Sequence, residues 1–343
     1  MAAQEAVDPS QAAGAQIPLQ SFDIPIFPPQ AGRLKALTLT SDIKLDEYQE
    51  LLSKPYSIPR ILPPAIESLT LELFSLGYPA GFLAELATKL PNVKSLVVYS
   101  QLLGGISDES QADAVALFKQ LTGLRGLHLL DVFARKGFFE ALAPFVTYDD
   151  GSDSSDGNMG RRGLMFLEMN YTTQHEDEEF LSKVPASELP SLVGPGLVTL
   201  AFNVSEANET DDPEDPSNLG QSRVTDVSDT GTNPDVLKKD GVMTFNKTLA
   251  PGLVKALTEE GRRPVNLKVL NTTLYTLTFD HLRTILQKHA GLMVVMVTLE
   301  VEDAATCRKQ LLDILQSTVQ KVEQVEVVIS PGLQFFMAVS LAE

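Results

Sequence analysis

A short apolar pattern that recurs nine times is the strongest constraint on how this chain folds. In each copy, apolar residues occupy the first, fourth and sixth positions, and the positions between them vary. The copies are LKALTL (34–39), IESLTL (66–71), VKSLVV (93–98), LRGLHL (124–129), LMFLEM (164–169), LVTLAF (197–202), LKVLNT (267–272), LMVVMV (292–297) and VEQVEV (322–327). Of these 27 positions 26 are apolar, the exception being Thr272. Such internal repetition predicts an array of stacked units.

The spacing of the copies supports a true repeat. Their fourth residues lie 32, 27, 31, 40, 33, 70, 25 and 30 residues apart along the chain. The two longest intervals contain acidic stretches, at about 148–162 and 205–241, which we expect to be disordered insertions because they offer little apolar surface to bury. The longest interval also has room for a tenth, degenerate repeat near GVMTF (241–245).

Helical patterns separate the copies. Apolar residues recur at helical spacing, with polar residues between them, in segments 82–90, 114–121, 138–146, 253–260, 281–289 and 303–319. A chain that alternates strand and helix forms parallel strands joined by crossover connections. We therefore expect an α/β protein with a parallel sheet.

The direction of the side chains indicates that helices cover only one face of this sheet. Side chains alternate along a strand, so positions 4 and 6 point inward while positions 3, 5 and 7 point outward. The outward positions are mixed and mostly polar, whereas a sheet with helices on both faces is apolar on both. We expect residues 1–21 to be a disordered tail and residues 22–343 to be a single domain of about nine repeats.

This pattern resembles the leucine-rich-repeat superfamily, in the helix-backed form of the ribonuclease inhibitor and of F-box leucine-rich proteins. The resemblance covers roughly residues 34–330 and implies a horseshoe-shaped solenoid with the parallel sheet on the concave face and helices on the convex face. The family places Asn or Cys three residues after position 6. Here that place holds Asp42, Phe74, Gln101, Val132, Thr172, Ser205, Tyr275, Glu300 and Ser330, so the asparagine ladder of the family is absent.

Composition excludes several classes of protein. The 343 residues carry a formal net charge of −18, which argues against a surface that coats nucleic acid. The single cysteine excludes a disulfide scaffold. No apolar run is long enough for a membrane helix, and the first residues do not resemble a secretory signal. We therefore expect a cytoplasmic or nuclear protein, and a monomer.

The sequence contains no recognisable catalytic set. No phosphate-binding or dinucleotide-binding glycine motif is present, and none of the four histidines has metal-ligand spacing to another ligand. We predict that the chain is not an enzyme and has no cofactor and no metal site.

The concave face holds the residues that we expect to contact a protein partner. These candidates are Lys94, Tyr99, Arg125, His128, Glu168, Asn170, Asn203 and Asn271. Four of them, Lys94, Arg125, Tyr99 and His128, suggest a partly basic, aromatic patch that would bind an acidic or phosphorylated segment, supplied by a partner or by the protein's own acidic loop.

Three functions fit these features. The first is a non-catalytic scaffold or adaptor that binds proteins on the concave face. The second is an acidic chaperone or escort for a basic client, such as a histone or a ribosomal protein, suggested by the negative charge. The third, implied by the resemblance, is a substrate-recognition subunit like the F-box leucine-rich proteins.

Overall fold

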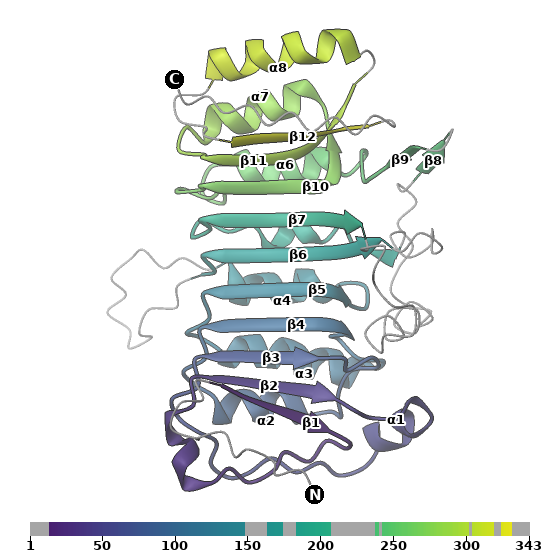
Figure 1. The fold of residues 1–343 in the computed structure, drawn as a ribbon, viewed down its shortest axis with the longest axis vertical. Helices are drawn as coiled ribbons and strands as arrows, with labels where there is room; N and C mark the ends of the chain where they lie inside the picture. The colour runs from purple at the N-terminus through teal and green to yellow at the C-terminus, as the bar shows by residue number, and fades with distance from the viewer. Residues whose placement is uncertain are drawn as a thin grey trace, which may run out of the picture.

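The computed structural model describes residues 14–147, 163–173, 183–206, 237–239, 242–301, 304–318 and 324–330. Ten parallel strands form one sheet, and they lie side by side in the order of the chain (Figure 1). They are β1 (Gly14–Leu19), β2 (Ala36–Ser41), β3 (Ser68–Glu72), β4 (Ser95–Leu102), β5 (Gly126–Phe133), β6 (Phe166–Thr173), β7 (Thr199–Glu206), β10 (Val269–Leu277), β11 (Val294–Glu300) and β12 (Gln324–Ser330).

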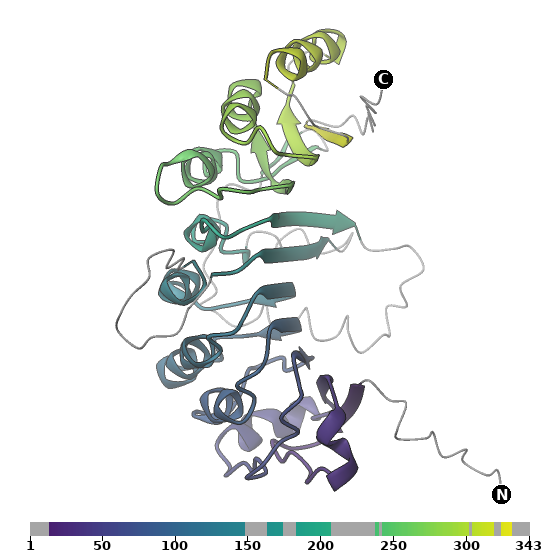
Figure 2. The ribbon, with the colours of Figure 1, turned by 90° about the vertical axis from the view of Figure 1, so that its left-hand side faces the viewer.

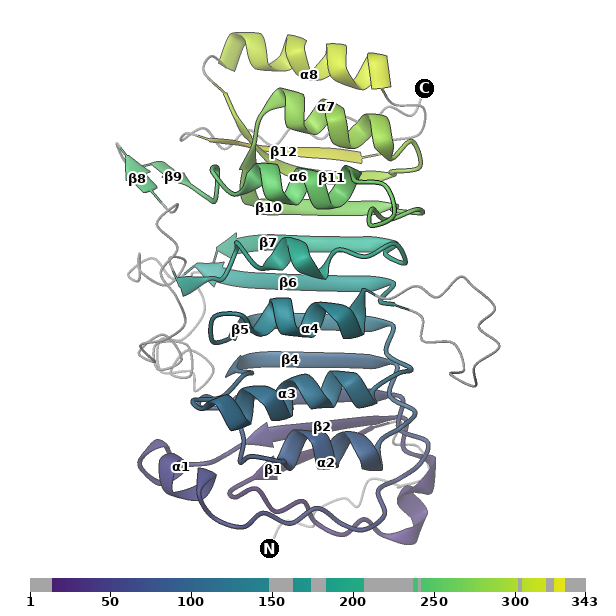
Figure 3. The ribbon, with the colours of Figure 1, turned by 180° about the vertical axis from the view of Figure 1, so that it is seen from behind.

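Helices cover one face of this sheet. Figure 3 shows them in front of the strands, and Figure 2 shows them on the outer side of a shallow arc, with the strands on the inner side. The α-helices of the described residues are α1 (Leu45–Leu52), α2 (Phe82–Lys89), α3 (Asp108–Gln120), α4 (Phe138–Val146), α6 (Ala250–Thr258), α7 (Phe279–Lys288) and α8 (Ala304–Thr318). A 3-10 turn, η3 (Leu189–Leu192), takes the place of a helix between β6 and β7. None of these helices is both long and apolar enough to cross a bilayer.

The repeat places its apolar residues in the core, as expected. The fourth residues of all nine copies pair with one another across the sheet, from Leu37 on β2 to Val325 on β12. Each of these side chains is at most 1% exposed. At about 25 cal/mol per Å² of buried apolar surface, this continuous row contributes much of the force that holds successive repeats together.

The N-terminal boundary of the fold differs from the expectation. Strand β1 lies within residues 1–21, so the predicted disordered tail is wrong from Gly14 onward, and residues 1–13 lie outside the described part of the chain. The β1 pairing places Ala15 beside Leu37 and Ile17 beside Leu39, where a small and a β-branched residue complete the apolar row. Pro18 cannot donate a backbone hydrogen bond, which suits a strand at the edge of a sheet.

The interval of 70 residues contains no further strand of the sheet among its described residues, because β7 pairs directly with β10. The segment near GVMTF forms β9 (Val242–Thr244), which pairs antiparallel with β8 (Leu237–Lys239) in a separate hairpin. The predicted disordered insertion is therefore wrong at β8 and at the end of β7. The rest of that insertion, and residues 148–162, lie outside the described residues.

Backbone carbonyl groups at the ends of the strands are bound by several residue types in place of an asparagine ladder. The Gln101 side-chain amide donates to the carbonyl of Leu71 at 2.8 Å, and its oxygen accepts from the Tyr78 hydroxyl at 2.6 Å. The Tyr171 hydroxyl donates to the carbonyl of Val132 at 3.0 Å. These two repeats therefore bind a strand-end carbonyl with different side chains, because a buried carbonyl needs only some donor within reach.

In two helices, a carboxylate from a later part of the chain accepts hydrogen bonds from backbone N–H groups of the first turn. Helix α2 follows Gly81 and has no capping side chain of its own, but the carboxylate of Asp113 on α3 accepts from the backbone N–H groups of Leu83 and Ala84 at 2.9 and 3.0 Å. In the same way Glu188 accepts from Gly137 at the start of α4 at 2.6 Å. A carboxylate is favourable there because the N–H groups of a first helical turn lack partners and the helix dipole is positive.

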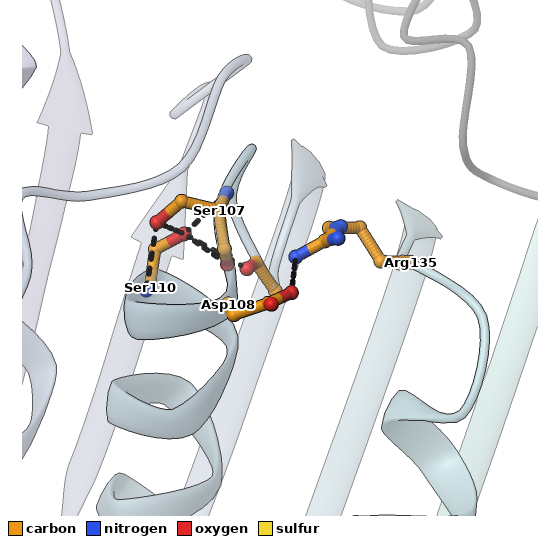
Figure 4. A network of polar contacts seen from close by, with 5 residues as sticks. Ser107, Asp108, Ser110 and Arg135 are labelled. Atoms are coloured by element: carbon orange, nitrogen blue, oxygen red, sulfur yellow. Dashed lines mark hydrogen bonds and ion pairs between the residues drawn. The ribbon is translucent and has the colours of Figure 1, made fainter.

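Helix α3, in contrast, is capped by its own residues (Figure 4). Ser107 and Ser110 form a capping box, in which each side chain binds the backbone N–H of the other residue. Asp108 in the first turn accepts from Arg135 at 2.7 Å, which ties α3 to the loop after β5.

Candidate binding surface on the open face of the sheet

The face of the sheet opposite the helices, which we call the open face, presents two rows of paired side chains. Row 5 and row 7 are the ladders formed by positions 5 and 7 of the repeat. Row 5 contains Gln16, Thr38, Thr70, Val97, His128, Glu168, Ala201, Asn271, Met296 and, by backbone pairing, Glu326 on β12. Row 7 contains Pro18, Thr40, Glu72, Tyr99, Leu130, Asn170 and Asn203. From β1 to β11 these residues are half-buried except Gln16 and Pro18, which are exposed, so the described helices leave this face accessible.

Row 7 ends where strand β10 bulges, whereas row 5 continues onto β11 and β12. Asn271 pairs with Met296 on β11, but the next pair joins Thr276 to Thr298, so β10 has four residues between the pairs and β11 has one. As a result Thr298, which the repeat pattern places on the outward side, is 3% exposed and donates to the carbonyl of Thr273 at 3.0 Å. The outward expectation is therefore wrong at this position.

Six of the eight predicted contact residues lie on the open face. They are Tyr99, His128, Glu168, Asn170, Asn203 and Asn271. His128 and Glu168 are neighbours on β5 and β6, and His128 Nδ1 lies 2.9 Å from a carboxylate oxygen of Glu168. This hydrogen bond lowers the pKa of the Glu168 carboxyl group, although partial burial opposes the effect.

The other two predicted residues, Lys94 and Arg125, lie at the amino-terminal edge of the sheet. Lys94 Nζ is 3.3 Å from a carboxylate oxygen of Glu67, which also binds Lys35. The Arg125 guanidinium donates to the carbonyl of Leu124 at 2.7 Å. Lys94 directly precedes β4, and Tyr99 lies five residues further along, or about 16 Å. The structure therefore does not gather Lys94, Tyr99, Arg125 and His128 into one patch.

The asparagines lie close together where β6, β7 and β10 meet. Asn170 and Asn203 are paired, and Asn170 Oδ1 accepts from the Ser205 hydroxyl at 3.2 Å. Asn271 Oδ1 accepts from the backbone N–H of Thr273 at 3.2 Å. Asn203 Oδ1 is buried and has no hydrogen-bond partner among the described residues. This region therefore offers amide groups near the centre of the open face.

The charges on the open face are acidic. From β1 to β11 the carboxylates in rows 5 and 7 are Glu72 and Glu168, with His128 bound to the latter, and neither row contains Lys or Arg on these strands. Glu72 accepts from the Thr40 hydroxyl at 2.8 Å. Between the two carboxylates lie Val97 and Leu130, which are half-buried and do not pack into the core. Glu72, Val97 and Leu130 are not among the predicted contact residues, although the spacing of the repeat assigns all three to outward positions.

Larger apolar side chains follow the amino-terminal edge of the later strands. Met165, Phe166 and Met293 are 41%, 43% and 36% exposed. Phe166 pairs with Gly126 on β5, so the surface steps from a buried glycine to an exposed ring between these two strands. This edge adds apolar surface beside the polar rows.

A buried carboxyl group lies at the carboxyl end of β5. Asp131 has a left-handed backbone with φ of 52°, is 3% exposed and accepts from the backbone N–H of Thr172 at 2.6 Å. Burial raises the pKa of the Asp131 carboxyl group from 3.8 to about 6, although hydrogen bonds from Thr172 oppose the effect. The sequence gives no sign of this because Asp131 follows two leucines in an ordinary strand.

No cluster of three His, Cys, Asp or Glu side chains in the described part of the chain could hold a metal ion. No protein-family model matches the chain, and a search of curated proteins finds no match to it.

Proposed function

We propose that this chain is a non-catalytic protein-interaction module that holds a partner on the open face of its sheet. The proposal includes the finer description of the fold as a leucine-rich-repeat-like horseshoe, similar to the ribonuclease inhibitor, with the open face as its concave side. A module of this type contributes an extended surface and needs no reactive group.

The observation that carries the proposal is the register of the outward side chains. The ten strands of the sheet bring one residue each to row 5, and at about 4.8 Å per strand this row is about 43 Å long. The described helices lie on the other face (Figure 3). A surface of this length, with side chains that differ from strand to strand, is suited to reading an extended segment of a partner.

The test is site-specific photocrosslinking in cells that make the protein. A benzoylphenylalanine placed at Ala201, in row 5, is compared with one at Glu109, which is exposed on helix α3. We expect a discrete protein adduct from position 201 and none from position 109. An additional Thr70→Arg substitution, also in row 5, should abolish that adduct. Adducts only from position 109, or none from either position, would reject the proposal.

A further inference from the structure

We infer that the partner segment is a basic, extended peptide that crosses strands β3 to β6, with two cationic side chains bound at Glu72 and Glu168. This inference deepens the proposed function and rests on the proposed use of the open face. It specifies a basic partner and the place where that partner binds. The net charge of the chain alone does not give the place.

Charge complementarity selects a basic segment. On rows 5 and 7 from β1 to β11 the carboxylates are Glu72 and Glu168, whereas Lys35 and Lys94 lie at the amino-terminal edge of the sheet. There Lys35 and Lys94 both bind Glu67. An acidic segment on rows 5 and 7 would meet carboxylates without a lysine or arginine beside it, whereas a basic one gains charge-assisted hydrogen bonds.

The spacing of the two carboxylates selects an extended conformation. Glu72 on β3 and Glu168 on β6 are separated by three strand spacings and by two positions along the strand direction, or about 16 Å. An extended chain advances about 3.4 Å per residue, so residues four apart are about 14 Å apart and point to the same side. Long arginine or lysine side chains bridge the remaining distance.

The surface between the carboxylates suits an apolar side chain. Tyr99 and Val97 on β4 and His128 and Leu130 on β5 lie there, and Val97 and Leu130 are half-buried and outside the core. A peptide residue midway between the two basic residues points toward the same face and would cover them. The expected motif is therefore basic, any, apolar, any, basic.

Fluorescence anisotropy with the full-length chain tests this motif. The probe is the fluorescein-labelled peptide Gly-Ser-Arg-Ser-Leu-Ser-Arg-Ser-Gly at low salt. We expect saturable binding, weakened about five-fold by Glu72→Gln, about five-fold by Glu168→Gln and about 25-fold by both, since one charge-assisted contact is worth on the order of 1 kcal/mol. The charge-matched variant Glu109→Gln, on the helical side, should bind the probe as the unmodified chain does.

Two further peptides separate the alternatives. Placing the two arginines two residues apart should weaken binding at least three-fold, and replacing both with glutamate should abolish it. Absence of binding by the first probe, binding that is insensitive to Glu72→Gln and Glu168→Gln, or binding of the glutamate peptide that depends on Lys94 and Arg125 would each overturn the inference.

The crosslinking experiment distinguishes this failure from failure of the proposed function. If the adduct from position 201 is lost with Thr70→Arg but is unaffected by Glu72→Gln and Glu168→Gln, the open face binds a partner of different chemistry. In that case the proposed function stands and the basic peptide is rejected. If position 201 gives no adduct, both are rejected.

Discussion

Replacing Asp131 with asparagine should make the protein more stable at neutral pH. The carboxyl group is 3% exposed, and burial raises its pKa from 3.8 to about 6. At about 1.4 kcal/mol per pKa unit, ionisation of this group costs the native state about 3 kcal/mol above pH 7. Asparagine is neutral, accepts from the backbone N–H of Thr172 through its oxygen, and tolerates the left-handed backbone at this position.

The pH dependence follows from linkage. The native state holds the Asp131 proton more tightly than the unfolded chain does, so this residue's contribution to stability falls as pH rises from about 4 to about 6 and is constant above that. Between pH 5 and pH 8 the free energy of unfolding of the unmodified chain should fall by about 1.5 kcal/mol relative to Asp131→Asn.

Urea denaturation followed by far-ultraviolet circular dichroism measures this difference, and the chain has no tryptophan to provide a fluorescence signal. Comparing the two chains at each pH cancels the titration of the other carboxyl groups. A difference that is independent of pH, or a variant less stable than the unmodified chain at pH 8, would refute the argument. The carboxyl carbon resonance of Asp131 gives the pKa directly.

Three further predictions concern contacts between repeats, and denaturation by urea checks each. Asp113→Ala removes the acceptor for the first turn of α2 and should lower the free energy of unfolding by about 1–3 kcal/mol, whereas no loss would show that the cap is dispensable. Gln101→Leu leaves a buried carbonyl and a tyrosine hydroxyl unpaired and should cost about 1–3 kcal/mol, and an unchanged midpoint would contradict this account. Gly77→Ala should cost more than about 3 kcal/mol, because its φ is 85° and a Cβ atom would lie 2.6 Å from the Cα of Gly105. Gly137→Ala is the control, with φ of 82° but open space around a Cβ atom, and should cost about 1–2 kcal/mol; equal losses would show that the close approach is unimportant.

The sequence predicted the sheet because its signal is repeated and local. Leu37, Leu69 and Leu96 recur in one position of one pattern, and parallel pairing in register follows from that repetition. Strand β1 was not predicted because its inward residues are Ala15 and Ile17, which match the leucine pattern too weakly. The bulge in β10 was not predicted because nothing in the local sequence specifies that β10 has more residues than β11 between two consecutive pairs.

For the candidate site, the sequence predicted which side chains point outward but not which of them form pairs. The alternation of a strand assigns Tyr99, His128 and Asn170 to the outward side without knowledge of their neighbours. Which charged side chains form pairs depends on the register between neighbouring strands and on contacts between those strands. The pairing of His128 with Glu168 and of Lys94 with Glu67 could not be derived from single copies of the repeat. For this reason the sequence suggested a basic patch where the structure has an acidic face.

The carboxylates that cap the starts of α2 and α4 make the dependence of one helix on another directional along the chain. In both cases the capping residue comes from a later part of the chain, so the earlier helix depends on residues that follow it. A fragment truncated from the C-terminal side loses these acceptors, whereas a fragment truncated from the N-terminal side keeps them. During synthesis α2 emerges from the ribosome before Asp113 does, and its first turn is completed only when the next helix arrives.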